Sequence, residues 1–250
     1  MDNYINLIMD KLPPSIRDDK STLVALGVTL LVLFVTLIVL GFISKSRKGS
    51  RVLLLGLSDS GKTVLFSQLV GSKSVSTFTS MKQNECQLVL PKRSVALIDI
   101  PGFERLRDKY WNDLKKGVRS IVFVVDSYQI TSNIKDVADY FYTILADKLV
   151  ISQKIPILVA CNKQDKPKSK AAKVIRTLLE KEINSIRETR AAALESTDGD
   201  NERSRVIGSL DREFSFNDLK NTIDFVDCIA ESKEDSSCQI EDITCWLNKF

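Results

Sequence analysis

The sequence predicts an α/β protein with a mostly parallel β-sheet and helices on both faces, preceded by one transmembrane helix. Three observations carry this prediction. Short apolar runs alternate with stretches of helical periodicity, a glycine-rich loop joins the first such run to the first helix, and a long uncharged segment precedes them all. Strands buried on both faces are almost continuously apolar, and strands that alternate with helices form parallel sheets.

The uncharged segment lies between Lys20 and Lys45 and holds 24 residues (positions 21 to 44), mostly Leu, Val, Ile and Phe. As a helix it would be roughly 36 Å long, enough to cross a hydrocarbon core with some tilt. It is longer than a signal-peptide core and is followed by ISKSRKG rather than by a small-residue cleavage site. We therefore expect a transmembrane helix at 21–43, a short luminal N-terminus at 1–20 and a basic linker at 44–50.

The basic residues around this segment favour a cytosolic location for the C-terminal side, by a slim majority. Four follow it and three precede it: Lys45, Arg47, Lys48 and Arg51 after, and Lys11, Arg17 and Lys20 before. Residues 51–250 are accordingly expected to form a cytosolic domain.

The pattern within this domain alternates between strands and helices. Strands are expected at 52–57, 86–90, 95–100, 121–126, 155–161 and 223–230, and helices at 62–70, 134–149, 171–194 and about 237–249. Ligands of such sheets bind at the carboxyl ends of the strands, so function is expected in the loops that follow them.

Composition excludes several classes of function. The net charge is +4 and the basic residues are scattered, which is too weak a signal to argue for nucleic-acid binding. The chain has no histidine, so catalytic triads with histidine, histidine general bases and most zinc sites are excluded. Its five cysteines form no CxxC pair and are expected to be free thiols in a reducing compartment.

The stretch GLSDSGKT fits the pattern GxxxxGK[ST] of a phosphate-binding loop, with a strand before it and a helix after it. Its glycines allow backbone N–H groups to point at phosphate oxygens, Lys62 places a cation between the β- and γ-phosphates, and Thr63 offers its hydroxyl to Mg²⁺. The predicted contacts are Gly56, Leu57, Ser58, Asp59, Ser60, Gly61, Lys62, Thr63 and Val64. An ordinary Gly/Ser turn is the alternative interpretation.

The motif DIPG, residues 99–102, closes a predicted strand. Asp99 can hold Mg²⁺ through water, and the Gly102 N–H can contact the γ-phosphate. A strand-ending Pro-Gly turn is the alternative interpretation.

The motif NKQD, residues 162–165, predicts which base is bound. Guanine presents two adjacent donors, N1–H and the exocyclic amine, and the Asp165 carboxylate can accept from both. Adenine lacks this pair, so the carboxylate would be left unpaired. Asn162 can contact the purine edge and the stem of Lys163 can lie along the ring face. GTP and Mg²⁺ are therefore the expected ligands.

Two further assignments leave alternatives open. Thr77, Thr79 and Ser80 could each supply a hydroxyl to Mg²⁺ and the γ-phosphate, with Thr79 preferred, but a polar loop accounts for them nearly as well. The N–H of Ala230 could reach the guanine carbonyl, although a buried strand end explains this residue equally well.

These motifs, together with LIDIPGFERLR, IVFVVDS and DCIA, resemble the small GTPases of the Ras superfamily within the P-loop NTPases, nearest to the Arf and Sar branch. More narrowly, they resemble the β subunits of the signal recognition particle receptor over roughly residues 20–250. The stretch between Asp165 and Cys228 is longer than an ordinary small GTPase needs, and an insertion at about 185–220 matches that family.

The resemblance implies a single-pass protein of the endoplasmic reticulum membrane whose GTP-bound switch loops dock the N-terminal domain of the receptor's α subunit. It also implies proximity to the ribosome or the translocon during co-translational targeting, with no direct nucleic-acid binding by this chain.

One departure concerns hydrolysis. Where Ras-type enzymes place a water-orienting glutamine, this chain has Phe103, so we expect slow or partner-dependent hydrolysis. An Arf/Sar-like GTPase of vesicle trafficking is the alternative, but Asp2 stands where myristoylation needs a glycine. The NKQD motif argues against a third hypothesis, an ATP-using kinase.

Overall fold

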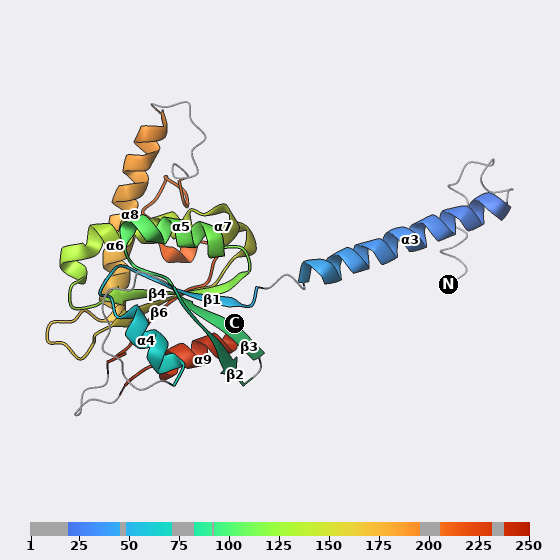
Figure 1. Cartoon of the computed structure of the whole chain (residues 1–250). Helices are drawn as coiled ribbons and strands as arrows, with labels where there is room; N and C mark the ends of the chain where they lie inside the picture. The colour runs from blue at the N-terminus through green and yellow to red at the C-terminus, as the bar shows by residue number, and fades with distance from the viewer. Residues whose placement is uncertain (1–19, 46–48, 72–82, 92, 196–205, 232–237) are drawn as a thin grey trace. The chain divides into compact units, whose positions relative to one another are not determined.

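The computed structural model describes residues 20–45, 49–71, 83–91, 93–195, 206–231 and 238–250 (Figure 1). The chain divides between residues 48 and 49 into two compact units, which are described separately.

The first unit contains helix α3 (Lys20–Lys45), whose described side chains, at 24, 25 and 27–38, are exposed. The Thr36 hydroxyl donates to the Leu33 carbonyl oxygen over 2.8 Å, so this polar group is bonded within the helix. Over the described part of the chain, no helix combines the length and the apolar character that crossing a membrane requires. The membrane span at 21–43 stays a prediction.

The second unit is built on one sheet. Among the described residues its order is β2-β3-β1-β4-β5-β6, and β2 pairs antiparallel with β3 while the other neighbours pair in parallel. The strands are β1 (Arg51–Leu55), β2 (Asn84–Leu90), β3 (Arg93–Asp99), β4 (Val118–Asp126), β5 (Ile157–Asn162) and β6 (Ile223–Asp227). The mostly parallel α/β fold expected from the sequence is confirmed.

Helices cover both faces of this sheet. They are α4 (Lys62–Leu69), α5 (Glu104–Leu114), α6 (Ile130–Leu145), α7 (Lys148–Gln153), α8 (Ala172–Glu195) and α9 (Glu241–Lys249), with a short 3₁₀ turn η2 (Phe216–Asp218). Figure 1 shows α4 and α9 below the sheet and α5, α6 and α7 above it. Alternate residues of a strand face opposite sides, so Leu53 packs in the core with α6 while Val52 packs in the core with α4 and α9.

Two helices differ from the sequence-based expectation. The helix expected at 134–149 starts at Ile130 as α6, and a new helix, α7, begins after Asp147. The Asp147 carboxylate caps α7 by accepting from the Leu149 N–H over 2.8 Å, and its other oxygen accepts from Trp111 Nε1 over 3.1 Å. Helix α5 was not expected, although Leu106, Tyr110 and Leu114 recur at helical spacing beside Trp111, its one fully buried residue.

The described part of the expected insertion folds back on the long helix α8. Arg187 on α8 is 2% exposed, and its guanidinium donates to the main-chain oxygens of Ser209 and Arg212 and to the Asn184 side chain. The Phe214 ring lies 5.9 Å from the guanidinium carbon. A single buried arginine therefore ties the returning segment to α8.

Candidate functional site

The predicted site residues gather at the carboxyl edge of the sheet. The glycine loop follows β1, Asp99 is the last residue of β3, Asp126 ends β4 and Asn162 ends β5. In parallel sheets these ends lie side by side, which is where ligands of such folds bind.

The glycine loop turns sharply between β1 and α4. Gly56, Asp59 and Gly61 have φ angles of 141°, 61° and 89°, and Gly61 is the residue just before α4. A Cβ atom on Gly61 would collide with the side-chain amide of Asn162, so glycine is required where the loop passes the base-reading motif. Lys62, Thr63 and Val64 form the first turn of α4, where free N–H groups favour an anion.

Lys62 lies buried beneath this loop, with 6% of its surface exposed. Its ammonium donates to the Leu57 carbonyl oxygen over 2.6 Å. Burial lowers its pKa to about 8, although the nearby Asp99 and Asp59 carboxylates act in the opposite direction. The lysine therefore holds a positive charge that lacks full compensation and that a phosphate would stabilise.

Thr63, Asn84 and Asp99 form a polar cluster beside Lys62. The Thr63 hydroxyl donates to Asp99 Oδ2 over 2.7 Å, and the Asn84 amide donates to the same oxygen over 3.3 Å. Asp99 Oδ1 is buried and has no hydrogen-bond partner among the described residues. Burial raises the pKa of Asp99 despite these donors and Lys62. An unpaired buried carboxylate oxygen next to a hydroxyl is a donor set that suits Mg²⁺.

Gly102 lies against the glycine loop, in the segment between β3 and α5. A Cβ atom there would lie 2.5 Å from the Ser58 nitrogen and 2.7 Å from the Lys62 ammonium, so only glycine allows this approach. The next residue, Phe103, caps α5 and is 50% exposed. No polar side chain therefore occupies the position after Gly102.

Asn162 connects three parts of the edge and is 2% exposed. Its amide donates to the Ser60 carbonyl oxygen over 3.0 Å, and its side-chain oxygen accepts from the Ala230 N–H over 3.0 Å. The structure thus brings Ala230 to the base-reading motif, but its N–H is bonded to Asn162. The expected contact of this N–H with guanine stays a prediction.

Lys163 lies in the left-handed region, with a φ of 68°. Its ammonium donates to the Asp59 carbonyl oxygen over 2.5 Å and forms an ion pair of 2.7 Å with Asp126. The second oxygen of Asp126 accepts from the N–H groups of Tyr128 and Gln129. Strand β4, the glycine loop and the base-reading motif are therefore linked through one lysine.

Gln164 anchors the motif from the opposite side. Its amide nitrogen lies 2.8 Å from Asp227 Oδ1, 2.9 Å from the Lys170 carbonyl oxygen and 3.0 Å from the Ser127 hydroxyl. Asp227 Oδ1 also accepts from the Ala172 N–H, the first residue of α8, over 2.7 Å. By contrast, no described residue donates a hydrogen bond to Asp165, which leaves that carboxylate available to a ligand.

The sequence did not predict four residues whose hydrogen bonds support the site. Three residues that it did predict, as hydroxyl ligands, have no described position. Asn84, Asp126, Gln164 and Asp227 act through contacts that no motif specifies, although an aspartate at the end of a buried strand was a usable signal for Asp126 and Asp227. Thr77, Thr79 and Ser80 lie outside the described residues.

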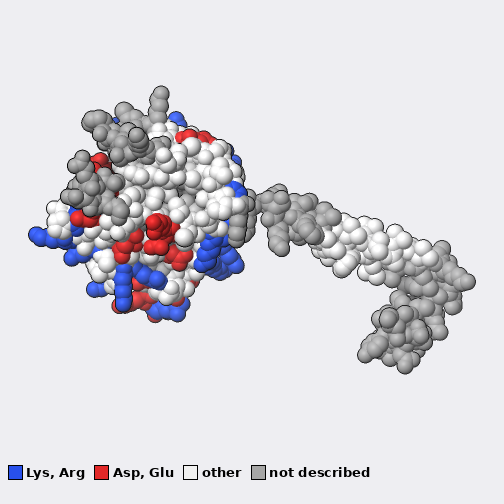
Figure 2. Space-filling model, turned by 90° about the horizontal axis from the view of Figure 1, so that it is seen from below, with Lys and Arg blue, Asp and Glu red and all other residues white. Residues whose placement is uncertain are grey.

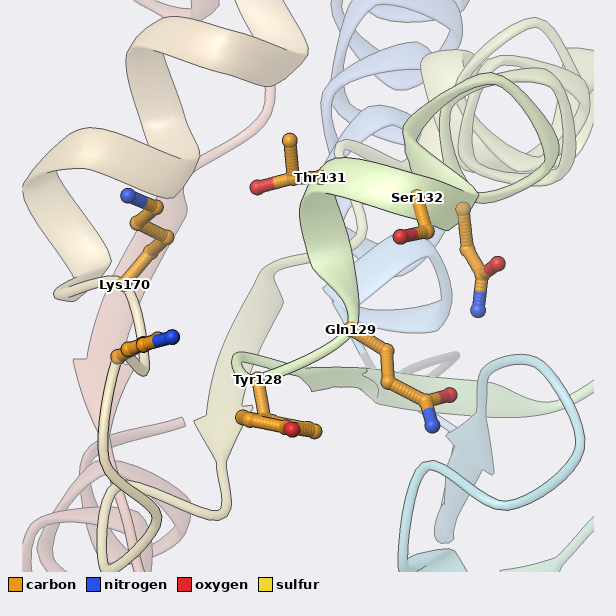
Figure 3. A pocket seen from close by; sticks show the side chains of 7 residues that line it. Tyr128, Gln129, Thr131, Ser132 and Lys170 are labelled. Carbon is orange, nitrogen blue, oxygen red and sulfur yellow. The ribbon is translucent and has the colours of Figure 1, made fainter.

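A pocket of about 630 Å³ lies beside the motif, between the start of α6 and the loop that leads to α8 (Figure 3). Figure 3 shows Tyr128, Gln129, Thr131 and Ser132 on one side and Lys170 on the other. Its lining includes none of the residues predicted to contact nucleotide, so we do not assign the nucleotide to it.

The sheet order, the glycine loop and the base-reading motif at one edge define the class of protein, the small GTPases. A family model described as "Signal recognition particle receptor beta subunit" matches residues 47–223. The chain is 36% identical over 249 residues to signal recognition particle receptor subunit beta of Homo sapiens, which covers 97% of this chain and 92% of that protein. The chain therefore belongs to the family of signal recognition particle receptor β subunits.

Solved structures agree with this assignment. A structure of the mammalian signal recognition particle receptor matches with a TM-score of 0.70 and 36% identity, covering 80% of this chain and 98% of that one. An SRb-GTP/SRX complex from Chaetomium thermophilum matches with a TM-score of 0.64 over 80% of this chain and 99% of that one. At 21% identity the second likeness shows the fold alone.

Proposed function

We propose that this chain is the membrane-anchored, GTP-binding subunit of the signal recognition particle receptor at the endoplasmic reticulum. Its GTP-bound switch loops dock the receptor's α subunit through the N-terminal domain of that subunit. The observation that carries the nucleotide assignment is the linkage of Asn162 to Ser60, which fixes the base-reading motif against the phosphate loop while Asp165 stays unpaired.

The residues divide the recognition of GTP among them. Backbone N–H groups of the glycine loop and Lys62 bind the phosphates, and Asp165 accepts from the two donors of guanine. Thr63 would hold Mg²⁺ directly and Asp99 through water; when bound, this ion neutralises phosphate charge. In the same proposal, the Thr79 hydroxyl reaches Mg²⁺ and the γ-phosphate, and the Gly102 N–H contacts the γ-phosphate. The Ala230 N–H reaches the guanine carbonyl.

Phe103 makes GTP a long-lived ligand in this proposal. Its half-exposed ring offers neither a donor nor an acceptor to an attacking water, and the chain has no histidine to substitute. Slow hydrolysis keeps the switch loops in the state that binds the partner until another protein completes the site.

The anchor is proposed from the sequence and from family membership. The 24 uncharged residues that precede the domain are long enough to span, and the basic residues that follow favour a cytosolic domain. Ribosome and translocon are expected near the docked α subunit rather than bound directly.

Docking is tested with the full chain in nanodiscs, loaded with GTP or GDP and mixed with the N-terminal domain of the α subunit. We expect stable capture with GTP and at least about tenfold weaker capture with GDP, because the γ-phosphate orders the switch loops. Equal capture in both states would contradict the switch. Resistance of the chain to alkaline extraction from membranes tests the anchor independently.

A further inference from the structure

Basic side chains gather at the edge of the sheet opposite the nucleotide. Arg51 begins β1 and Arg93 begins β3, while Lys116 lies two residues before β4 and Arg119 is the second residue of β4. Lys249 ends α9 next to them. We call these five residues the basic edge. Figure 2 shows a group of basic side chains at the right-hand margin of the domain, with acidic side chains nearer the centre of that face.

Hydrogen bonds show that the members of the basic edge are neighbours. Arg93 and Arg119 converge on the main-chain oxygen of Phe250, at 2.7 and 2.6 Å. Arg51 donates to the main-chain oxygen of Lys116 over 3.3 Å. Lys116 and Lys249 are exposed, and the Lys249 ammonium lies 5.3 Å from the centre of the Phe250 ring, whereas the three arginines are partly buried.

The charges of the basic edge are not neutralised by acidic side chains. Within the described residues, none of the five is paired with an acidic side chain, whereas the neighbouring Lys115 is paired with Asp147 over 3.0 Å. Arg93 and Arg119 already share the main-chain oxygen of Phe250, the last residue of the sequence, so Lys116 and Lys249 are the charges most open to an external anion. Burial and then the Arg93 guanidinium lower the pKa of Arg119, which shows that two like charges lie close together at this edge.

Arg51, the first residue of the basic edge, follows the end of helix α3 by six positions in the sequence. The residues from Lys45 to Arg51 span at most roughly 20 Å when fully extended. They include Arg47 and Lys48, so the sequence itself adds positive charge to the approach. If α3 is in a bilayer, the basic edge is held close to the headgroups, where each Lys or Arg is attracted to anionic lipid.

We propose that the basic edge binds the anionic phospholipid surface of the membrane that carries the anchor. This inference rests on the proposed anchor. It orients the domain with the starts of β1, β3 and β4 toward the lipid and with the glycine loop and Asp165 facing away from it. The nucleotide and the switch loops are thereby open to soluble partners.

The test compares the full chain in nanodiscs of phosphatidylcholine alone with nanodiscs that contain about a quarter phosphatidylserine. Hydrogen–deuterium exchange is followed at 115–119 and 245–250. We expect at least about fivefold slower exchange with phosphatidylserine, lost at high salt because screening weakens contacts between exposed charges. Exchange at 130–145 on α6 should not change.

The double variant Lys116→Glu with Lys249→Glu should abolish the difference between the two lipids. The control, Lys135→Glu with Lys173→Glu, changes two exposed lysines of α6 and α8 by the same charge and should leave it intact. Equal exchange in both lipids, in a chain that has inserted, would overturn the basic-edge inference and leave the anchor standing. Failure to insert in any lipid would overturn both, and protection by added polyglutamate alone would assign the edge to an acidic protein.

Discussion

Asp165 differs from its neighbours in the motif because its carboxylate is left open for a ligand. Asn162, Lys163 and Gln164 are each held by hydrogen bonds to other strands or loops, whereas no described residue donates to the Asp165 carboxylate. The fold therefore fixes the backbone of the motif and leaves one acceptor free. Such an acceptor suits the paired donors of guanine.

Changing Asp165 should change the base that is bound. Asp165→Asn should weaken GDP binding by about 100-fold or more, because two charge-assisted hydrogen bonds of about 1.5–3 kcal/mol each are lost. Xanthine nucleotides should bind the variant better than guanine nucleotides, since they offer a carbonyl where guanine has its amine. Competition against a fluorescent nucleotide measures both, and Asp211→Asn is a control at an exposed aspartate of the insertion. An unchanged guanine preference would remove Asp165 from the base pocket.

Lys62 predicts a pH dependence of nucleotide binding. Its pKa of about 8 in the free protein lies below the unfolded value of 10.5, so it loses its proton as the pH rises above about 8. A bound phosphate favours the charged form and raises this pKa, so binding should take up a proton near pH 8. Affinity should fall as the pH rises from about 8 toward 10.

Calorimetry in two buffers of different ionisation enthalpy measures this proton uptake directly. The free energy of unfolding of the nucleotide-free protein changes with pH in the opposite direction. Between pH 8 and 10.5 the unfolded chain binds more protons at Lys62 than the folded chain does, so the contribution of this lysine to stability increases as the pH rises. Proton release on binding at pH 8, instead of uptake, would contradict the burial of a charged Lys62.

The residues that carry the chemistry could be found in the sequence because their spacing is fixed by the ligand. A loop that wraps a phosphate needs glycine at set positions, and a carboxylate that reads guanine must follow a buried strand. The supporting residues are not constrained in this way. Asn84 reaches Asp99 across the antiparallel β2–β3 pair, and Asp227 reaches Gln164 from a different strand, so only the folded register shows these contacts.

At the scale of elements, Asp227 joins the base-reading loop to helix α8. One carboxylate oxygen accepts from Gln164 and from the first N–H of α8, so the end of β6 fixes both the motif and the start of the longest helix of the second unit as described. Displacing this carboxylate should loosen the guanine site without removing any group that contacts the nucleotide.

Asp227→Ala should speed the release of GDP by about three- to tenfold and lower the free energy of unfolding by about 1–2 kcal/mol, the usual effect of losing a helix cap. Stopped-flow release of a fluorescent GDP and urea unfolding measure the two effects. Asp242→Ala, an exposed aspartate in the first turn of α9, is the matched control. Release as slow as in the unchanged chain would mean that Gln164 is held well enough by Ser127 and Lys170.

Strands in which nearly every residue is buried could be predicted from the sequence more closely than the helices could. The central strands are apolar on both faces, so their positions agree with the expected ranges within a few residues. Helix α5 buries a single tryptophan, and the division between α6 and α7 depends on the side chain of Asp147. The division leaves no period in the sequence, whereas the helical spacing of Leu106, Tyr110 and Leu114 was a usable signal for α5.

At the scale of the whole molecule, the proposed function makes the lifetime of the docked complex depend on the lifetime of GTP. The apolar Phe103 occupies the position from which a polar side chain would orient water, next to Gly102 and Lys62. We therefore expect the two states of the switch to interconvert slowly unless a partner supplies the missing group.

Phe103→Gln should raise intrinsic GTP hydrolysis by at least about tenfold, which corresponds to about 1.4 kcal/mol of transition-state stabilisation. Single-turnover hydrolysis by the full chain in nanodiscs measures this rate. Phe103→Leu keeps the position apolar and should show no increase. If glutamine also fails to accelerate hydrolysis, the limit lies elsewhere in the switch loops.

Arg187 makes helix α8 and the returning segment at 209–212 depend on each other. The two terminal nitrogens of its guanidinium donate to acceptors from the returning segment at 209–212 and from Asn184, whereas its buried Nε has no partner and the group has no acidic partner among the described residues. Removing that segment would leave the permanently charged guanidinium buried without these acceptors, which would cost about 3 kcal/mol or more of stability. A shortened chain that lacks the returning segment would therefore be more stable with Arg187 replaced by an uncharged residue.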